Sequence, residues 1–235
     1  MEILYKDDSL VAIYKPAGVP SLPERSGPKG DDALAWIRQK VHPQAHLLHR
    51  LDKPTSGILL ASWDKATFDA IFSQFSGHTV EKKYWALVEG QAHFDMAELN
   101  VPISPEKRRA DPFEGKPALT IVHTLESFRK HTLVLCVPVT GRPHQVRIHL
   151  AYYGHPIVND TLYGGQPLYL SSFHLRYKPD PRHPERPLHP ENIIFLHAGY
   201  LRFVHPALGK PLTIEAAAPK YFEIGLRQLR KYGAR

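Results

Sequence analysis

The sequence predicts an α+β protein built mainly on antiparallel β-sheet, with helices flanking the sheet. Predicted strands outnumber predicted helices, most connections between neighbouring strands suit hairpins, and neither an internal repeat nor a heptad pattern is present. The 235 residues, 43% of them hydrophobic, can bury a core of ordinary size. We therefore expect one domain over residues 1–235, built either as a single body or as two lobes about a central cleft.

Turn residues, caps and hydrophobic periodicity define the elements of the first half. Asp7 and Asp8 predict the turn of an N-terminal hairpin, and either Asp31 or Asp32 can cap a helix. Four apolar residues from Phe68 to Phe75, including Phe72, recur at i, i+3, i+4 and i+7 and predict an amphipathic helix. In chain order we expect strands at 3–5 and 10–14, a helix ending near residue 41, a buried strand at 58–61, a helix over 64–75 and a strand over 82–89.

The second half contains two further hairpins and two further helices. Residues 98–117 predict a long loop, a length that is usually functional or mobile. A helix opens at 140–143, with Pro143 at or near its first turn, and Val146, Leu150 and Tyr153 form its apolar stripe. Gly154 is a suitable stop for it. The remaining expectations are a hairpin of strands 118–128 and 132–139, a Pro-rich basic insertion at 166–190, a hairpin over 193–217 and a basic helix over 219–232.

The charge of the chain favours a polyanionic partner. Its 30 Lys and Arg residues against 23 Asp and Glu give a formal net charge of +7 and a pI near 9.4, and neutralisation of phosphates drives much of nucleic-acid binding. The basic residues gather in two places. The first cluster is Lys107, Arg108 and Arg109, and the second is Arg227, Arg230, Lys231 and Arg235.

Composition also argues against several classes of protein. No apolar run approaches the ~20 residues that a membrane span needs, and the N-terminus lacks the basic-then-apolar layout of a signal peptide. The single cysteine, Cys136, cannot form an internal disulfide, which fits a reducing compartment. The sequence therefore predicts a cytoplasmic protein with no membrane partner, in which Cys136 is a small buried hydrophobic residue.

Several familiar sites are absent from the sequence. Residues 27–30 lack the longer glycine frame of a phosphate-binding loop, and residues 55–57 lack the Gly-x-Ser-x-Gly nucleophile elbow. No Cys-x-x-Cys or His-Glu-x-x-His frame accompanies the 15 histidines, and His144 and His149 are five apart, so on a helix they point to different sides. We therefore expect no metal, no nucleotide cofactor and no other cofactor.

What remains is a carboxylate close to arginines. Asp52 follows Arg50 by two residues, in a loop that leads into the apolar strand. Arg142 and Arg147 lie at a predicted helix start, where the dipole and backbone N–H groups also favour anions. An arginine against a buried carboxylate keeps it ionised and aimed, as a covalent nucleophile requires. On residue types alone, a surface charge pair or an ion pair joining two lobes stays open as the alternative.

Longer stretches around these residues resemble one enzyme family. His-Arg-Leu-Asp-Lys-Pro-Thr-Ser-Gly at 49–57 resembles the signature of RluA-type pseudouridine synthases, His-Arg-Leu-Asp-x-x-Thr-Ser-Gly. Other stretches are similar to further motifs of that family, and together they cover nearly the whole chain. They are Lys-Pro-Ala-Gly at 15–18, Lys-Tyr at 83–84 followed by Ala-Leu-Val, Thr-Gly-Arg-Pro-His-Gln-Val-Arg-Ile-His-Leu at 140–150, Gly-His-Pro-Ile-Val-Asn-Asp at 154–160 and Leu-His-Ala at 196–198.

The resemblance implies a pseudouridine synthase catalytic fold with an RNA-binding cleft, isomerising a uridine in structured rRNA or tRNA. Asp52 would be the nucleophile, Tyr84 would stack on the flipped base and is a candidate for proton transfer, and Arg147 would pair with Asp52. Extruding the base costs a few kcal/mol, and Arg50 would fill the gap left in the RNA helix. The other residues assigned to RNA contact are His49, Arg142, Lys107, Arg108 and Arg109.

The sequence departs from the family pattern in its details. Pro143 stands where relatives often have a small hydroxyl residue, and segment 166–190 looks like an insertion relative to the smallest members. With no room before Ile3 for a small RNA-binding domain, we expect recognition by the 98–117 loop, the insertion and the terminal helix. The alternative is a catalytically idle RNA-binding or ribosome-assembly protein, although such a protein needs no carboxylate facing a polyanion. We expect a monomer.

Overall fold

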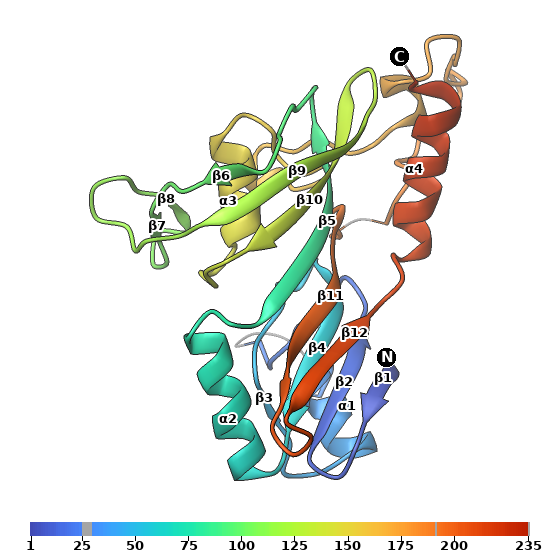
Figure 1. The fold of residues 1–235 in the computed structure, drawn as a ribbon. Helices are drawn as coiled ribbons and strands as arrows, with labels where there is room; N and C mark the ends of the chain where they lie inside the picture. The colour runs from blue at the N-terminus through green and yellow to red at the C-terminus, as the bar shows by residue number, and fades with distance from the viewer. Residues whose placement is uncertain (25–29, 191, 235) are drawn as a thin grey trace. The chain divides into compact units, whose positions relative to one another are not determined.

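The structure is a computed structural model, and it describes residues 1–24, 30–190 and 192–234 (Figure 1). The chain divides into two compact units. Unit 1 contains Met1–Tyr84 and His197–Ala217, and unit 2 contains Trp85–Leu196 and Ala218–Arg235. Strands dominate both units and most pairs are antiparallel, so the predicted α+β class is confirmed.

The strands of unit 1 follow the order β1-β2-β4-β11, and the first half of β5 comes next to β11. β1 and β2 form the predicted hairpin, and β11 and β12 form another. One pair is parallel: β4 and β11 pair through Ser56 with His197 and Gly57 with Ala198. The bounds are β1 (Glu2–Lys6), β2 (Leu10–Lys15), β3 (His46–Leu47, beside β4), β4 (Ser56–Ser62), β5 (Glu81–Glu89), β11 (Leu196–His205) and β12 (Lys210–Glu215, beside β11).

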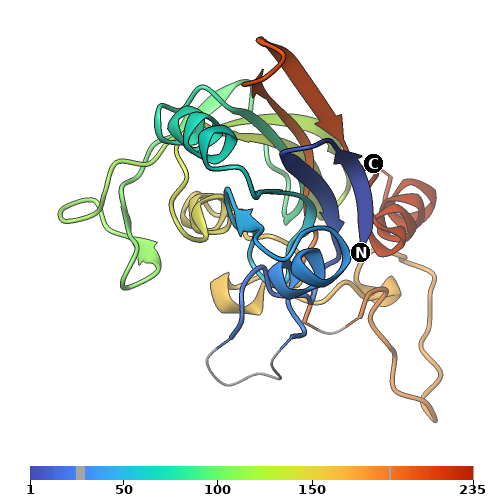
Figure 2. The ribbon, with the colours of Figure 1, turned by 90° about the horizontal axis from the view of Figure 1, so that it is seen from below.

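Both faces of the unit 1 sheet are covered, which explains why β4 is an unbroken apolar run. Ile58 and Leu60 pack with Ile71 of α2 (Lys65–Ser76), and Leu59 packs with Ile37 of α1 (Ala33–Lys40). Alternate residues of a strand point to opposite faces, so the two helices lie against different faces (Figure 2). The sheet is therefore a rigid base for whatever precedes β4.

The N-caps of the two helices in unit 1 are the predicted residues, but one residue predicted to be buried is exposed. Asp32 accepts a hydrogen bond from the Ala35 N–H and caps α1, and Asp64 caps α2 through the Thr67 N–H. Phe72 departs from the predicted apolar stripe because its side chain is 51% exposed. The buried face of α2 is centred on Ile71 instead.

The strands of unit 2 follow the order β5-β10-β9-β6, of which β9 and β10 form the predicted hairpin. Cys136 is buried in β10, and burial raises the pKa of its thiol. Phe222, Leu226 and Leu229 of α4 point inward as expected. The bounds are β6 (Ala97–Leu99), β9 (Thr120–Ser127), β10 (His131–Pro138), α3 (Gln145–Tyr152), η1 (Thr161–Tyr163), η2 (Leu170–Ser172) and α4 (Lys220–Tyr232).

The predicted loop at 98–117 is wrong as a description, because these residues form structure of their own. Part of β6 lies here, and β7 (Ile103–Ser104) and β8 (Arg109–Ala110) make a second, two-stranded sheet. Figure 1 shows this hairpin reaching out from the side of unit 2 that lies away from α4. The strands are too short for a periodicity signal, and their register is set by the turns.

The start of α3 also differs from the prediction. The helix begins at Gln145, with His144 at its N-cap in the left-handed region (φ +55°), so Arg142 and Pro143 precede the helix. The Gln145 side chain explains the displacement: its Oε1 accepts from the Thr140 hydroxyl and the Arg142 N–H, and its Nε2 donates to the Leu119 carbonyl. The predicted stop is right, since Gly154 follows the C-cap, but Tyr153 is 39% exposed.

The Pro-rich segment 166–190 packs onto the rest of unit 2. Leu168 and Phe173 are fully buried, and the Nε2 of His189 accepts from the Leu168 N–H at 3.0 Å. The ring of His174 lies 4.1 Å from that of Tyr232 in α4. In the part of the chain that the structure describes, no helix is both long and apolar enough to cross a membrane.

Candidate active site

The loop that carries Asp52 is held by backbone and side-chain hydrogen bonds. The Ser21 hydroxyl accepts from the Leu51 N–H (3.0 Å) and donates to the Leu51 carbonyl (2.7 Å), so one side chain satisfies both backbone groups of the neighbouring residue. The Thr55 N–H donates to the Asp52 carbonyl at 3.0 Å. Asp52 itself is half-buried. The carboxylate therefore stands on a fixed turn immediately before the buried strand β4.

A buried lysine lies under this turn. The Lys15 ammonium, with no exposed surface, donates to the carbonyl oxygens of Val19 (2.7 Å), Pro16 (3.1 Å) and Lys53 (3.3 Å). Burial lowers the pKa of Lys15 to about 7, and the charge of Asp52 acts in the opposite direction. In the sequence, Lys15 stands out only as the first residue of the Lys-Pro-Ala-Gly motif. A lysine that ends an apolar strand just before a proline is the signal that could have singled it out.

The end of the turn requires glycine and is tied to β11. Gly57 has a φ of +133°, and a Cβ there would lie 2.2 Å from the Ala198 carbonyl oxygen. The Ser56 hydroxyl lies 2.9 Å from Nδ1 of His197, whose Nε2 lies 2.9 Å from the Ala216 carbonyl. Because a carbonyl only accepts, Nε2 carries the proton and Nδ1 accepts from Ser56. The Thr-Ser-Gly motif thus anchors the turn to β11.

Tyr84 lies on β5 and packs against the cluster that contains Leu51 and Ala198. Burial raises the pKa of its hydroxyl, and the charge of Asp52 raises it further. The charge of Asp52 therefore acts on the Tyr84 hydroxyl within unit 1. Because the pKa is raised, the phenol keeps its proton at neutral pH and can donate a hydrogen bond.

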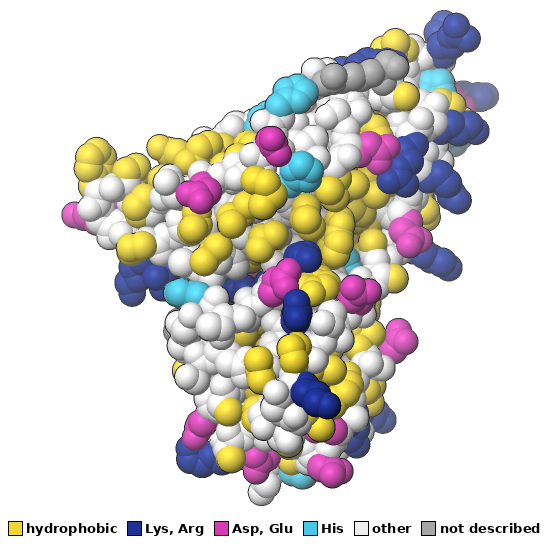
Figure 3. Space-filling view, in the orientation of Figure 1, with side chains coloured by type: hydrophobic (Ala, Val, Ile, Leu, Met, Phe, Trp, Pro, Cys, Tyr) yellow, Lys and Arg dark blue, Asp and Glu magenta, His cyan; other side chains and the backbone are white. Residues whose placement is uncertain are grey.

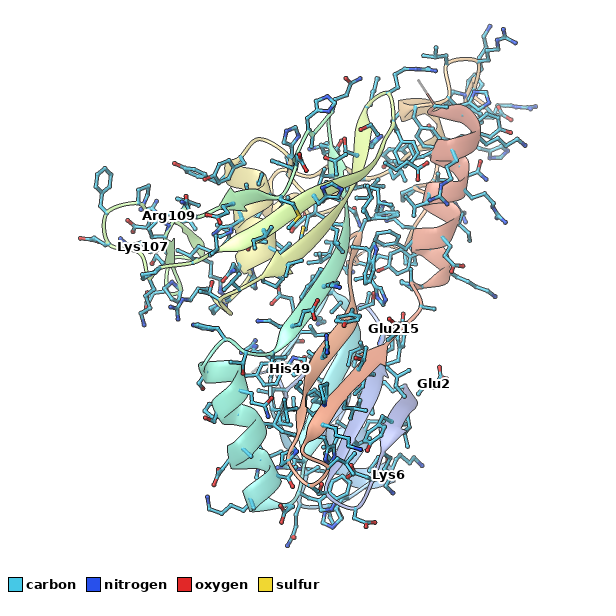
Figure 4. The ribbon with its side chains drawn as sticks, in the orientation of Figure 1. Glu2, Lys6, His49, Lys107, Arg109 and Glu215 are labelled. Carbon is cyan, nitrogen blue, oxygen red and sulfur yellow. The ribbon has the colours of Figure 1, made fainter. Side chains whose placement is uncertain are left out.

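The two residues that precede Asp52 behave differently from each other. Arg50 is exposed, as a group that contacts a partner would be. The Nε2 of His49 instead accepts from the Leu60 N–H (3.2 Å), and its ring stacks on Phe75 with ring centroids 5.0 Å apart. Burial lowers the pKa of His49 to about 3, with Lys82 adding to the effect. His49 therefore holds the strand before the turn against α2 (Figure 4).

In unit 2, Arg147 makes a two-point ion pair that the sequence did not predict. Its Nε and Nη2 donate to the carboxylate of Asp160 at 2.7 and 2.8 Å, and the two side chains are 5% and 2% exposed. Its Nη1 lies 3.2 Å from Nδ1 of His144, and its guanidinium lies over the Tyr163 ring, 5.0 Å from the centroid. Asp160 is the last residue of the motif at 154–160, and this position is the feature of the sequence that could have indicated a functional role. The predicted pairing of Arg147 with Asp52 joins the two units and stays a prediction.

The remaining predicted RNA-contact residues lie on the surface of unit 2. Arg142 donates through Nε to the Pro117 carbonyl at 3.0 Å. Lys107 bridges Asp111 (3.5 Å) and Glu114 (3.3 Å), which gives it a structural role in its hairpin. Arg108 and Arg109 are exposed, and over the described ranges neither has a carboxylate partner. Figure 4 shows Lys107 and Arg109 on this hairpin.

Neither unit contains a metal-binding arrangement over residues 1–24, 30–190 and 192–234: no group of three or more His, Cys, Asp or Glu side chains is placed to hold an ion. The arrangement around Asp52 is that of a fixed, half-buried carboxylate with a protonated phenol nearby. Such a site suits covalent attack by the carboxylate.

Comparison with known proteins identifies the class. The family described as RNA pseudouridylate synthase matches residues 9–152 of the chain. Ribosomal large subunit pseudouridine synthase C of Vibrio cholerae is 36% identical over 240 residues, which cover 97% of this chain and 69% of that protein. The protein of the same name from Escherichia coli is 32% identical over 245 residues, 97% of this chain and 70% of that protein.

Among solved structures, Human RNA Pseudouridylate Synthase Domain Containing 4 is similar with a TM-score of 0.74 at 28% identity, covering 97% of this chain and 93% of that chain. The fold and a match over 97% of the chain define an RNA-modifying isomerase. The chain belongs to the RNA pseudouridylate synthase family, and its reaction converts uridine to pseudouridine. The alternative of a catalytically idle binding protein is not favoured.

Proposed function

We propose that this chain isomerises a uridine of ribosomal RNA in the large subunit, with Asp52 as the covalent nucleophile. The relatives from Vibrio cholerae and Escherichia coli carry that substrate in their names, and they match 97% of this chain. The observation that supports the role of Asp52 most directly is its fixed turn, in which Ser21 and Lys15 hold the backbone on either side.

The reaction exchanges one bond to the ribose for another. The bond between C1′ of the ribose and N1 of uracil breaks, the base rotates, a bond forms between C1′ and C5, and the C5 proton is lost while N1 gains one. No electron acceptor or group donor is consumed. A carboxylate that attacks the substrate covalently, on either the sugar or the base, holds it while the base turns. The base must first leave its stack to reach Asp52.

We assign Tyr84 to contact with the flipped base rather than to proton abstraction. Its hydroxyl stays protonated because burial and the charge of Asp52 both raise its pKa. A neutral phenol can stack on a base or donate to a carbonyl oxygen, but it is a poor base at neutral pH. The proton-transfer role suggested by the resemblance would require Tyr84 to lose its proton first.

Arg147 is proposed to keep Asp52 ionised, and Asp160 is proposed to hold Arg147 for that purpose. The buried pair with Asp160 fixes the guanidinium at two points, which sets its plane as well as its position. A nucleophilic carboxylate gains from a neighbouring cation because its charged form is then favoured. Arg147 would act on the reacting carboxylate, and Asp160 would act through Arg147.

Contact with the RNA is assigned to exposed arginines. Arg50, two residues before the nucleophile, would occupy the place of the extruded base, where a planar guanidinium can stack. Arg108 and Arg109 would bind phosphates, with Arg142 beside them and Lys107 mainly holding the hairpin. We leave His49 out of the RNA contacts, because its ring nitrogen and ring face are both used within unit 1. We further propose that the protein acts in the cytoplasm as a monomer.

The first test is Asp52→Asn, which removes the charge and keeps the shape. We expect no pseudouridine formation on ribosomal RNA, with RNA binding within about threefold of the unchanged protein. The matched control is Asp69→Asn, because Asp69 is an exposed carboxylate of the same unit that pairs with Lys65 on the surface of α2, and this variant should isomerise uridine normally. Full activity of Asp52→Asn would overturn the mechanism.

The second test concerns the substrate. Pseudouridine mapping of total RNA from cells with and without the gene should show one or more sites lost from large-subunit ribosomal RNA. Complementation with the Asp52→Asn variant should leave those sites unmodified. If the lost sites lay only in transfer RNA, the ribosomal assignment would be wrong while the reaction type would stand.

A further inference from the structure

The hairpin of residues 103–116 in unit 2 is anchored firmly at its base. Ile103 is fully buried and packs with Ala118 and with Ile148 of α3. The backbone of Ile103 exchanges two hydrogen bonds with Lys116, at 3.0 and 2.8 Å. The carbonyl oxygen of Arg108 accepts from the Tyr163 hydroxyl at 3.1 Å. The hairpin is therefore fixed to the same α3 region that holds Arg147.

A tight turn over residues 111–115 is fixed by further hydrogen bonds. The Asp111 N–H donates to the Pro102 carbonyl (2.8 Å), and the Gly115 N–H donates to the Asp111 carbonyl (2.9 Å). One carboxylate oxygen of Asp111 accepts from the Glu114 N–H at 3.0 Å. A Cβ at Gly115 would lie 2.4 Å from the Asp111 carbonyl oxygen, so no larger residue fits there. Lys107 braces the turn from the side through its two carboxylate contacts.

This rigid turn presents an aromatic ring to solvent. The side chain of Phe113 is 96% exposed, more than any other large hydrophobic residue in the described ranges, and Leu175 comes next at 77%. Burying a phenylalanine is worth about 1.5–3 kcal/mol, so Phe113 contributes little to folding where it stands. Because the turn is already ordered, binding of a partner to the ring costs little conformational entropy of the turn.

The residues that precede Phe113 in the chain indicate the kind of partner. Arg108 and Arg109, five and four residues before it, are exposed cations without a carboxylate partner among the described residues. One exposed ring, with two exposed arginines four and five residues before it in the chain, does not form the contiguous apolar patch that a protein partner would cover. It does match an RNA strand, in which flat bases alternate with phosphates, and base–aromatic stacking is the usual way proteins hold unpaired bases.

We propose that Phe113 stacks on an unpaired base of the RNA substrate, while Arg108 and Arg109 hold the neighbouring phosphates. The proposal rests on the action of this chain on RNA and not on the assignment of Asp52. Phe113 would favour RNA substrates that offer a single-stranded base for stacking. It would add to binding without touching the reacting atoms.

Fluorescence of a Phe113→Trp variant tests the stacking directly. The probes are single-stranded oligouridylate and a fully paired RNA duplex of equal length, added to Phe113→Trp and to the unchanged protein, whose three tryptophans give the background. We expect the single strand to quench the added emission and the duplex to leave it nearly unchanged. Absence of quenching at saturating single strand would overturn the proposal. Running the same titration in an Asp52→Asn background separates this result from the fate of the proposed mechanism.

Binding constants separate stacking from simple apolar contact. Phe113→Ala should weaken single-strand binding by about 5- to 150-fold, the range of one stacked base, while Phe113→Trp should bind as tightly as the unchanged protein. Phe113→Leu should bind nearly as weakly as Phe113→Ala, because leucine has no flat face. The control is Leu208→Ala, at an exposed turn of unit 1, which should have no effect. Equal binding by Phe113→Leu and the unchanged protein, or by Phe113→Ala and the unchanged protein, would refute base stacking.

Discussion

The buried pair of Arg147 and Asp160 makes a quantitative prediction about stability. Asp160→Asn keeps the volume of the side chain and removes a charge that accepts two hydrogen bonds at 2.7 and 2.8 Å. Breaking a buried pair typically costs about 3–5 kcal/mol, because the remaining charge stays in a low-dielectric place. We expect about 3 kcal/mol for Asp160→Asn, the lower end, since Arg147 has further partners. For a chain of this size, that is a fall in Tm of roughly 6–12 °C.

A matched control comes from the surface of the same unit. Arg230 and Glu126 form an ion pair of similar geometry, with contacts of 2.8 to 3.1 Å, but their side chains are 54% and 34% exposed. Exposed pairs contribute about 0–1 kcal/mol, so Glu126→Gln should cost no more than that. Urea unfolding followed by circular dichroism measures both variants. A cost for Asp160→Asn as small as that for Glu126→Gln would refute the buried-pair reasoning.

The same residue tests whether Asp52 and Asp160 share Arg147. If they do, each single variant leaves the guanidinium with one carboxylate, and the double variant Asp52→Asn/Asp160→Asn leaves it with neither. The double variant should then lose about 1–3 kcal/mol more than the sum of the two single changes. Additivity within about 0.5 kcal/mol would show that Arg147 does not join the two carboxylates. The isomerase assay should show lost activity for all three variants.

Three further predictions concern other parts of the chain. The pKa of Lys15 is lowered to about 7 in the folded protein. From pH 7 upward the unfolded state therefore holds more protons than the folded state, and the free energy of unfolding rises by up to about 1.4 kcal/mol per pH unit. Between pH 7 and 8 this rise should be absent in Lys15→Met. Gly57→Ala should cost about 2–6 kcal/mol in urea unfolding, because both a left-handed φ and a 2.2 Å contact oppose the methyl group. Arg227→Gln and Lys231→Gln should each reduce the slope of log K against log salt by about 0.7–0.9 in RNA binding.

Each of these has an outcome that would count against it. A Lys15→Met variant with the same pH profile as the unchanged protein would mean that another group titrates there. Gly209 has a φ of +61°, and a Cβ added there would meet nothing within 4 Å, so Gly209→Ala should cost about 1 kcal/mol for the left-handed backbone alone. A cost at Gly57 as small as that at Gly209 would count against the predicted clash with Ala198. Figure 3 shows Lys and Arg side chains gathered over α4. An unchanged salt slope would mean that these basic residues do not contact RNA phosphates.

The fold was predictable wherever the signal was local. Asp32 and Asp64 cap their helices because a side-chain oxygen needs only the next turn of backbone, and the hairpins follow from turns between apolar runs. The parallel pairing of β4 with β11 was not predictable, because it joins residues about 140 apart. The start of α3 was misplaced because the Gln145 side chain supplies hydrogen bonds that a proline rule does not consider.

The site was predictable as a set of residue types and less so as a set of partners. Asp52, Tyr84 and Arg147 came from motifs, and motifs record which residues recur without recording what each one touches. Asp160 and Lys15 lie inside motifs that match the family, yet only the structure shows what they contact. His49 likewise has a contact that its motif does not record, since its Nε2 accepts from the Leu60 N–H, and its predicted contact with RNA stays a prediction.

The division of unit 1 into two separate segments of the chain has a consequence for folding during synthesis. Residues 85–196 interrupt unit 1, so β11, which lies between β4 and β5 in the strand order, is made long after its neighbours. When synthesis has reached Leu196, the turn that carries Asp52 is already made. Its partners in β11 are still missing: His197, which bonds Ser56, and Ala198, which pairs with Gly57. Pairings across such distances form late. The turn that carries Asp52 therefore lacks its contacts with β11 until about the last sixth of the chain has been made, and we expect no activity from the growing chain before then.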